Sequence, residues 1–227
     1  MAKILLACPC YRPHEKNRIS LPLFLKEVSK VHDIAYIEIW GKQLVDAQNE
    51  IAEFFLNSSK WDYLCILEDD NWGQKPEMLE DLLRANTLVA SINYLSRHFP
   101  FYSCLMQLQG KKGPFGEELY VPYDRPKDFQ EVDLSGYGMM LIKREVFNIL
   151  EKPYFRLNRI RGNGSYATDE DFCQRLRENG IRPVGIFKHC LGHRDVTSQN
   201  LQEKIEEGFE ELRQERNEYL KRKGYLC

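Results

Sequence analysis

Short apolar runs alternate with amphipathic stretches along most of the chain. Runs with the composition of buried strands occupy 3–8, 33–40, 63–67, 87–93 and 181–187. Between them, apolar residues recur at helical spacing over 19–31, 44–56, 76–84, 143–150 and 169–179. Strands that alternate with helices typically form parallel sheets covered on both faces. The pattern therefore predicts an α/β fold with a mostly parallel sheet flanked by helices.

The pattern becomes less regular in the second half of the chain. Two strand-like segments, 101–109 and 118–123, flank a turn-forming stretch and predict a β-hairpin. Segment 201–223 predicts a long, highly charged helix with little apolar face, packed on the exterior. We therefore expect a single domain with three parts: a regular half at about 1–95, a more irregular half at about 96–195 and a charged C-terminal helix at 196–227.

Composition and charge narrow the class of protein. The chain has 227 residues and is 43% hydrophobic, which is enough for one large α/β domain with an ordinary core. The net charge of −2 gives no bulk attraction to nucleic acid or to a membrane surface. No apolar run approaches the roughly 18 residues of a membrane span, and the N-terminus does not resemble a secretory signal. The 7 scattered cysteines favour a reduced compartment over a disulfide framework, so we expect a cytoplasmic protein.

Three consecutive carboxylates, Glu68, Asp69 and Asp70, directly follow the apolar run at 63–67. Open α/β sheets bind ligands just outside the carboxyl ends of their strands. Three acids at such a position repel one another at neutral pH unless a cation or a positive ligand offsets them. The segment therefore indicates a divalent metal site that holds a phosphorylated substrate. The alternative is a solvated acidic turn that happens to follow a strand.

Two neighbouring amides lie on the apolar side of the helix expected at 44–56. Helical spacing places Gln48 on one stripe with Ile51 and Phe55. Asn49 lies beside this stripe. Because buried amides are costly without hydrogen-bond partners, either nearby loop backbone or a ligand is expected to satisfy them.

The ordered spacing of five segments resembles that of GT-A-fold glycosyltransferases, in particular family 2. These segments are 4–11, 44–49, 67–71, 134–144 and 168–173, and the resemblance spans about residues 3–195. Members of this superfamily use a nucleotide-diphospho-sugar donor, usually with Mn²⁺ or Mg²⁺. Their Asp-x-Asp motif would fall on Glu68, Asp69 and Asp70, with glutamate at the first position. Because the glutamate arm is longer, the resemblance makes Asp70 the safer metal ligand.

The resemblance implies a metal site built from Asp70, Glu68 and a histidine beyond the last predicted strand. His193 occupies the position where the superfamily often supplies such a ligand, and His189 is the competing candidate. A hard divalent ion held by carboxylates can bridge diphosphate oxygens and neutralise the charge that develops on the leaving group. A histidine ligand favours Mn²⁺ over Ca²⁺, with Mg²⁺ as the alternative cofactor.

The acids that open the helix expected at 169–179 supply a candidate general base. Phe172 and Leu176 define the inward stripe of this helix, and Asp169 lies on the same side. The family's Glu-Asp pair also registers on Thr168 and Asp169. Both arguments select Asp169 as the base that deprotonates an acceptor hydroxyl in an inverting transfer. The alternative is a simple helix cap, because acids in a first turn are favoured by the helix dipole.

The remaining candidate residues are donor contacts. Tyr11 is placed to stack on a base and Arg12 to pair with phosphate, just past the first strand. Gly136 and Gly138 remove the side-chain barrier to close approach, which indicates a sugar-binding wall or, alternatively, a simple bulge. The donor-binding set predicted in this way comprises Pro9, Tyr11, Arg12, Gln48, Asn49, Glu68, Asp69, Gly136 and Gly138.

These observations together predict a metal-dependent glycosyltransferase. We expect a nucleotide-binding first half and an acceptor-binding irregular half, with a UDP-sugar donor by analogy with the family. The acceptor hydroxyl belongs to a glycan, a protein, a small molecule or a modified nucleic-acid base. One alternative is a sugar-phosphate nucleotidyltransferase, which is disfavoured because the first strand lacks a glycine-rich basic loop for a triphosphate. The other is a non-catalytic module that binds nucleotides or carbohydrates.

Overall fold

Two sheets and five helices make up the part of the chain that the computed structural model describes, which is all of it except residues 12–14, 97–101, 114–116, 158–167 and 194–227. The strands of the larger sheet are β1 (Lys3–Cys10), β2 (Asp33–Trp40), β3 (Tyr63–Leu67), β4 (Asn71–Trp72), β5 (Val89–Tyr94), β8 (Phe129–Glu131), β10 (Met139–Lys143) and β11 (Val184–His193). The smaller sheet contains β6 (Leu105–Lys112), β7 (Glu118–Pro122) and β9 (Leu134–Ser135). The helices are α1 (Glu15–Val28), α2 (Leu44–Asn57), α3 (Pro76–Arg84), α4 (Val146–Ile149) and α5 (Thr168–Glu178).

The larger sheet has the order β2-β1-β3-β10-β5-β11-β4, and β8 pairs with β11 outside this path. The strands β1, β2, β3, β5 and β11 run in one direction, whereas β4, β8 and β10 run in the other. The predicted α/β class with a mostly parallel sheet is confirmed. The sequence pattern did not indicate that β10 would enter the centre of the sheet as an antiparallel strand between β3 and β5.

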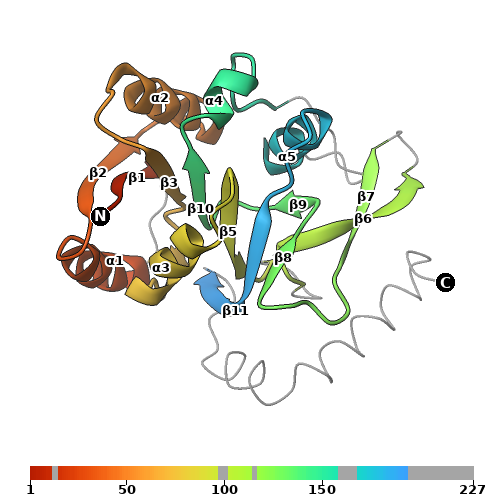
Figure 1. The fold of residues 1–227 in the computed structure, drawn as a ribbon, viewed down its shortest axis with the longest axis horizontal. Helices are drawn as coiled ribbons and strands as arrows, with labels where there is room; N and C mark the ends of the chain where they lie inside the picture. Colours follow the sequence, from red (N-terminus) through yellow and green to blue (C-terminus); the bar gives the residue numbers. More distant parts are fainter. Residues whose placement is uncertain (12–14, 97–101, 114–116, 158–167, 194–227) are drawn as a thin grey trace.

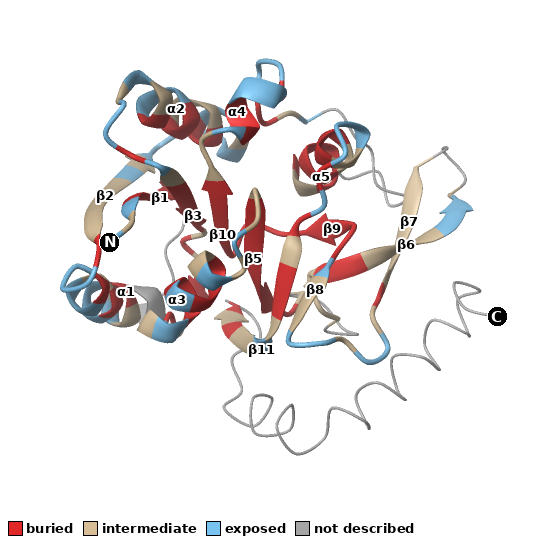
Figure 2. Cartoon of the chain, in the orientation of Figure 1, coloured by how far each residue is buried: buried red, intermediate tan, exposed pale blue. Residues whose placement is uncertain are grey.

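Helices cover both faces of this sheet because its central strands alternate apolar side chains between the faces (Figure 1). In β1, Leu5 and Ala7 pack into the cluster that includes residues of α2, α4 and α5. Ile4 and Leu6 pack on the opposite face with residues of α1 and α3. Figure 2 shows the resulting band of buried residues along the central strands. The sheet is therefore the middle layer of a three-layer fold.

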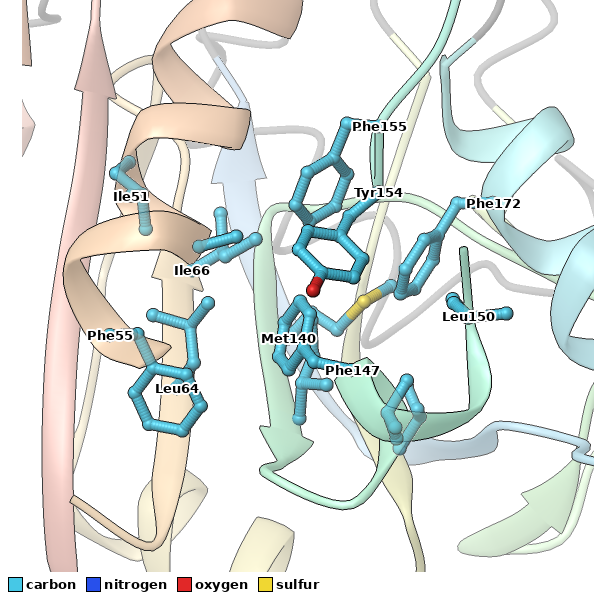
Figure 3. Packing of buried hydrophobic residues seen from close by; sticks show 14 of the residues in the cluster. Ile51, Phe55, Leu64, Ile66, Met140, Phe147, Leu150, Tyr154, Phe155 and Phe172 are labelled. Atoms are coloured by element: carbon cyan, nitrogen blue, oxygen red, sulfur yellow. The ribbon is translucent and has the colours of Figure 1, made fainter. Parts of the chain in front are cut away.

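Aromatic side chains dominate the packing under α2, α4 and α5. Figure 3 shows Phe55 and Ile51 of α2 on one side of the cluster and Phe172 of α5 on the other. Phe172 stacks on Phe155, with ring centroids 5.1 Å apart and planes inclined by 20°. Both rings are almost completely buried. This packing fixes α5 against the sheet, so the acidic first turn of α5 has a defined place.

The predicted elements are confirmed with several changes of boundary. The hairpin is formed by β6 and β7, which are antiparallel. The first helix ends at Val28, and the helix expected at 143–150 is reduced to α4 because β10 continues to Lys143. The last predicted strand, 181–187, is instead β11 and extends to His193. The charged helix expected at 201–223 lies outside the described residues. None of the described helices is long and apolar enough to cross a membrane.

The parallel strands place several candidate residues along one edge of the sheet. Tyr11 follows β1, Glu68 follows β3, Tyr94 ends β5 and His193 ends β11. Because β10 is antiparallel, its start lies at the same edge, and the Glu68 amide donates to the carbonyl of Gly138 at 3.4 Å. This edge is where an open α/β sheet binds ligands.

Candidate functional site

Asp70 and His193 approach each other at the edge of the sheet. The antiparallel pairing of β4 with β11 puts His193 opposite Asn71, one residue from Asp70. The His193 Nε2 lies 3.4 Å from the Asp70 Oδ2, and both side chains are largely buried. The Nδ1 lies 2.8 Å from the carbonyl oxygen of Leu95. A carbonyl can only accept, so Nδ1 carries a proton, and in the neutral ring Nε2 presents a lone pair towards Asp70.

This pair could hold a metal ion between its two side chains. A lone pair and a carboxylate repel each other unless a proton or a metal ion lies between them. The hydrogen bond from Nδ1 to a backbone carbonyl is the usual arrangement behind a histidine ligand. Imidazole together with carboxylate suits Mn²⁺. Within the described residues, however, no group of three or more His, Cys, Asp or Glu side chains is placed to hold a metal. Among these residues Glu68 does not form such a group with Asp70 and His193, and its role as a metal ligand stays a prediction.

Asn71 orients the acidic segment and was not in the predicted site. Its side chain is fully buried, and its Nδ2 lies 3.2 Å from the Asp70 Oδ1 and 3.4 Å from the Glu68 Oε2. A donor between two carboxylates offsets part of their repulsion. It also engages the Asp70 oxygen that does not face His193. The signal in the sequence was an amide directly after three acids.

Asp69 joins the ends of two neighbouring strands. Its Oδ2 accepts a hydrogen bond from the Tyr11 backbone amide at 2.7 Å, and its side chain is buried. The contact therefore fixes the start of the loop after β1. Contacts of Asp69 and of Pro9, in β1, with a donor stay predictions. Tyr11 is 69% exposed, and its stacking on a base stays a prediction. Arg12 lies outside the described residues.

The two amides of α2 have different environments. Asn49 donates to the carbonyl of Phe155 at 2.8 Å and accepts from the Phe155 amide at 3.1 Å. The hydrogen-bonding groups of Asn49 are thus satisfied by loop backbone, which was one of the two partners expected from the sequence. Contact of Asn49 with a donor stays a prediction. Gln48 is completely buried, and neither its Oε1 nor its Nε2 has a hydrogen-bond partner among the described residues. Its contact with a ligand stays a prediction.

The glycine pair makes room for an aromatic ring. A Cβ added at Gly136 would lie 1.9 Å from the Tyr94 hydroxyl oxygen, and one at Gly138 would lie 2.6 Å from the Tyr94 Cδ1. Both distances are too short for a real side chain. The neighbour that requires these glycines is therefore Tyr94, a residue of the fold itself. Contact of Gly136 and Gly138 with a sugar stays a prediction.

Tyr94 marks the place where the acids of distant segments meet. Burial is the main reason that the pKa of its phenol is raised well above the usual value, followed by Cys104. The next contributions to this pKa come from the carboxylates of Glu68, Asp169 and Asp70. Coulombic effects of this kind require proximity. The first turn of α5 and the acids that follow β3 therefore both lie near the Tyr94 phenol.

Asp169 lies in the first turn of α5 and is partly exposed. Its Oδ1 accepts from the Glu170 amide at 3.0 Å and so satisfies one of the amides in the first turn that have no partner within the helix. The inward stripe of Phe172 and Leu176 is confirmed, since both are completely buried. Asp171 in the same turn is buried, whereas Asp169 is partly exposed. Asp169 also contributes to the raised pKa of Tyr94, and its role as the general base stays a prediction.

His189, the competing histidine, is directed to a different partner. Its Nε2 lies 2.7 Å from the Oδ2 of Asp81, in α3, and Lys188 pairs with the same carboxylate at 2.6 Å. The pairing register between β11 and β5 shifts between Ile186 and Cys190. His189 therefore contacts α3 through Asp81, whereas His193 contacts Asp70 at the edge of the sheet.

This difference predicts separate effects of the two histidines. His193→Ala should lower Mn²⁺ affinity by at least about tenfold, because one of two protein ligands is lost. His189→Ala should leave that affinity within about twofold and only weaken the contact between β11 and α3. Isothermal titration of Mn²⁺ in the presence of UDP measures both. A larger loss for His189→Ala would identify the wrong histidine.

No protein-family model and no curated protein matches the sequence. Among solved structures, A197 from STIV aligns with a TM-score of 0.53 and 16% identity over 83% of this chain and 83% of that chain. A mutant Drosophila β1,4-galactosyltransferase 7, in complex with manganese, UDP-Gal and xylobiose, aligns with a TM-score of 0.50 and 16% identity over 90% and 74% of the two chains. GalNAc-T7 with UDP, GalNAc and Mn²⁺ gives a TM-score of 0.49 and 10% identity over 85% and 44%.

These comparisons establish the class of fold. The order of elements, the mixed eight-stranded sheet and the similarity to solved structures define a GT-A-like α/β domain. Membership of glycosyltransferase family 2 in particular stays a prediction.

Proposed function

We propose that this chain is a metal-dependent glycosyltransferase that moves a sugar from a UDP-sugar to an acceptor hydroxyl. The observation that carries the proposal is the approach of His193 to Asp70 where the parallel strands end. A divalent cation held between the imidazole and the carboxylate would suit both groups. The galactosyltransferase with a similar fold was solved with manganese and UDP-Gal, which supports the same cofactor and donor class.

The residues around Tyr94 could supply the three roles that such a transfer needs, which are metal binding, orientation of the metal ligand and removal of a proton. Mn²⁺ or Mg²⁺ would supply Lewis-acid neutralisation of the leaving diphosphate. Asp70 and His193 would hold the ion, and Asn71 would keep Asp70 oriented by donating to its other oxygen. Asp169 would take the proton of the acceptor hydroxyl. Direct attack by that oxygen would invert the anomeric centre.

The proposal predicts that a nucleotide sugar stabilises the protein only when metal is present. A ligand at 100 times its Kd adds about 2.7 kcal/mol, which corresponds to a rise in Tm of roughly 5–10 °C for a domain of this size. Thermal unfolding with a panel of UDP-sugars and GDP-sugars, with Mn²⁺ or with EDTA, measures this effect. Time-dependent release of the nucleoside diphosphate then shows turnover.

The same experiment separates the alternatives. Stabilisation without turnover across a broad panel of donors and acceptors would favour a non-catalytic binding module. A protein that no nucleotide sugar stabilises, with or without Mn²⁺, would contradict the proposed function.

A further inference from the structure

Tyr94 and Leu95 hold the ring of His193 from two directions. The Leu95 carbonyl accepts from Nδ1 at 2.8 Å. The ring of Tyr94 meets the imidazole nearly at right angles, with centroids 5.2 Å apart and planes inclined by 87°. This is the edge-to-face arrangement that aromatic pairs prefer. A rotation of the imidazole about its own bond to Cβ would therefore be opposed by the Tyr94 ring as well as by loss of the hydrogen bond.

The position of the Tyr94 ring is itself tightly determined. Tyr94 is 5% exposed and ends β5, where it pairs in register with Leu191 of β11, two residues before His193. Gly136 and Gly138 leave the space that the ring and its hydroxyl fill. The sheet on one side and the glycine pair on the other fix the Tyr94 ring, so the ring can restrict the rotation of the His193 imidazole.

We propose that Tyr94 is a positioning residue, whose ring holds the His193 imidazole with Nε2 towards Asp70 and so sets the affinity of this pair for a divalent cation. Tyr94 acts through His193 and does not itself bind the cation. The inference rests on the proposed metal-dependent function. Outer-shell partners that orient a histidine ligand typically contribute 10–100-fold to metal affinity.

The proposal assigns the effect to the ring rather than to the hydroxyl or the backbone. Tyr94→Leu removes the aromatic ring beside His193 but keeps the Leu95 carbonyl, because that acceptor belongs to the backbone. Tyr94→Phe keeps the ring and removes only the hydroxyl, which lies over Gly136. Tyr94→Met fills much of the same space with a flexible side chain. It tests the loss of the ring if the leucine variant does not fold.

The chain offers a closely matched control. Tyr154 is 6% exposed and meets Phe147 edge to face, with centroids 5.1 Å apart and planes inclined by 87°. Tyr154→Leu therefore removes an aromatic contact of the same geometry from the core. It leaves the contact of Tyr94 with His193 intact, so it reports the effect of general destabilisation alone.

The experiment is a Mn²⁺ titration in the presence of UDP, followed through the electron paramagnetic resonance signal of free Mn²⁺. Tyr94→Leu and Tyr94→Met should lower Mn²⁺ affinity about tenfold, and Tyr94→Phe and Tyr154→Leu should stay within about twofold. In transfer assays, the Mn²⁺ concentration for half-maximal rate should rise for Tyr94→Leu. The rate at saturating Mn²⁺ should change by less than about twofold.

Several results would overturn the inference. These are a folded Tyr94→Leu variant with unchanged Mn²⁺ affinity, an equal loss in Tyr154→Leu, and an equal loss in Tyr94→Phe. If unaltered protein binds Mn²⁺ and His193→Ala does not, such results concern Tyr94 alone. Failure of the unaltered protein to bind Mn²⁺ with UDP present would overturn the proposed function together with this inference.

Discussion

Asp169→Asn should lower turnover about 10²–10⁴-fold while leaving Mn²⁺ and donor affinity nearly unchanged. The amide has the shape of the carboxylate, and its oxygen can still accept from the Glu170 backbone at the start of α5. The fold and this contact in the first turn should therefore persist, whereas the ability to take a proton is lost. Steady-state kcat, measured by release of the nucleoside diphosphate, and donor Kd, measured by calorimetry, test the two halves of this expectation.

Glu170→Gln is the matched control for this prediction. Glu170 lies in the same helical turn as Asp169, experiences the same helix dipole and is buried. Loss of the Glu170 charge in this variant should change kcat by less than a few-fold. If Asp169→Asn instead turns over normally, or loses only thermal stability, Asp169 is a helix cap. A larger fall in kcat for Glu170→Gln would assign the base to Glu170.

The first half of the fold was predictable because its signals are local. The buried strands β1 and β3 are short apolar runs, and α2 shows one apolar stripe with Ile51 and Phe55. The acidic segment ends such a run, so its position at the carboxyl edge follows from the general rule for α/β sheets. The sequence therefore located Glu68, Asp69 and Asp70 correctly at the strand end.

The contact between Asp70 and His193 depends on pairings that no local pattern carries. The strand β4 has only two residues, and its register with β11 decides which histidine meets the acids. The sequence placed His193 after the last strand, but it is the final residue of β11. The preference for His193 over His189 came from the family resemblance, and the geometry gives it an independent physical reason.

Residues that act by filling space were the hardest to find. The glycine pair at Gly136 and Gly138 gave a visible signal, but its partner Tyr94 lies forty-odd residues earlier and looks like any strand residue. Asn71 was visible only as an amide after the acids. Such roles are set by three-dimensional complementarity, which composition and periodicity do not encode.

Asp70→Ala should abolish metal-dependent donor binding, with a loss of Mn²⁺ affinity of more than about 100-fold, because only His193 of the pair remains. The folded state should change little. Removal of one acid relieves repulsion with Glu68 and Asp69, while Asn71 loses one of its acceptors, so the free energy of unfolding should stay within about 1 kcal/mol. Calorimetry with Mn²⁺ and UDP measures affinity, and urea unfolding without metal measures stability.

Two further variants show which feature of Asp70 matters. Asp70→Asn keeps an oxygen for Asn71 but removes the charge, so it should lose nearly as much Mn²⁺ affinity as Asp70→Ala. Glu68→Gln should lose less, since Glu68 does not complete a metal-binding set with Asp70 and His193 among the described residues. Unchanged Mn²⁺ affinity in Asp70→Ala would remove the metal site from this edge of the sheet. A greater loss in Glu68→Gln would move the primary ligand to the first acid of the segment, where the longer arm would reach an ion that Asp70 does not hold.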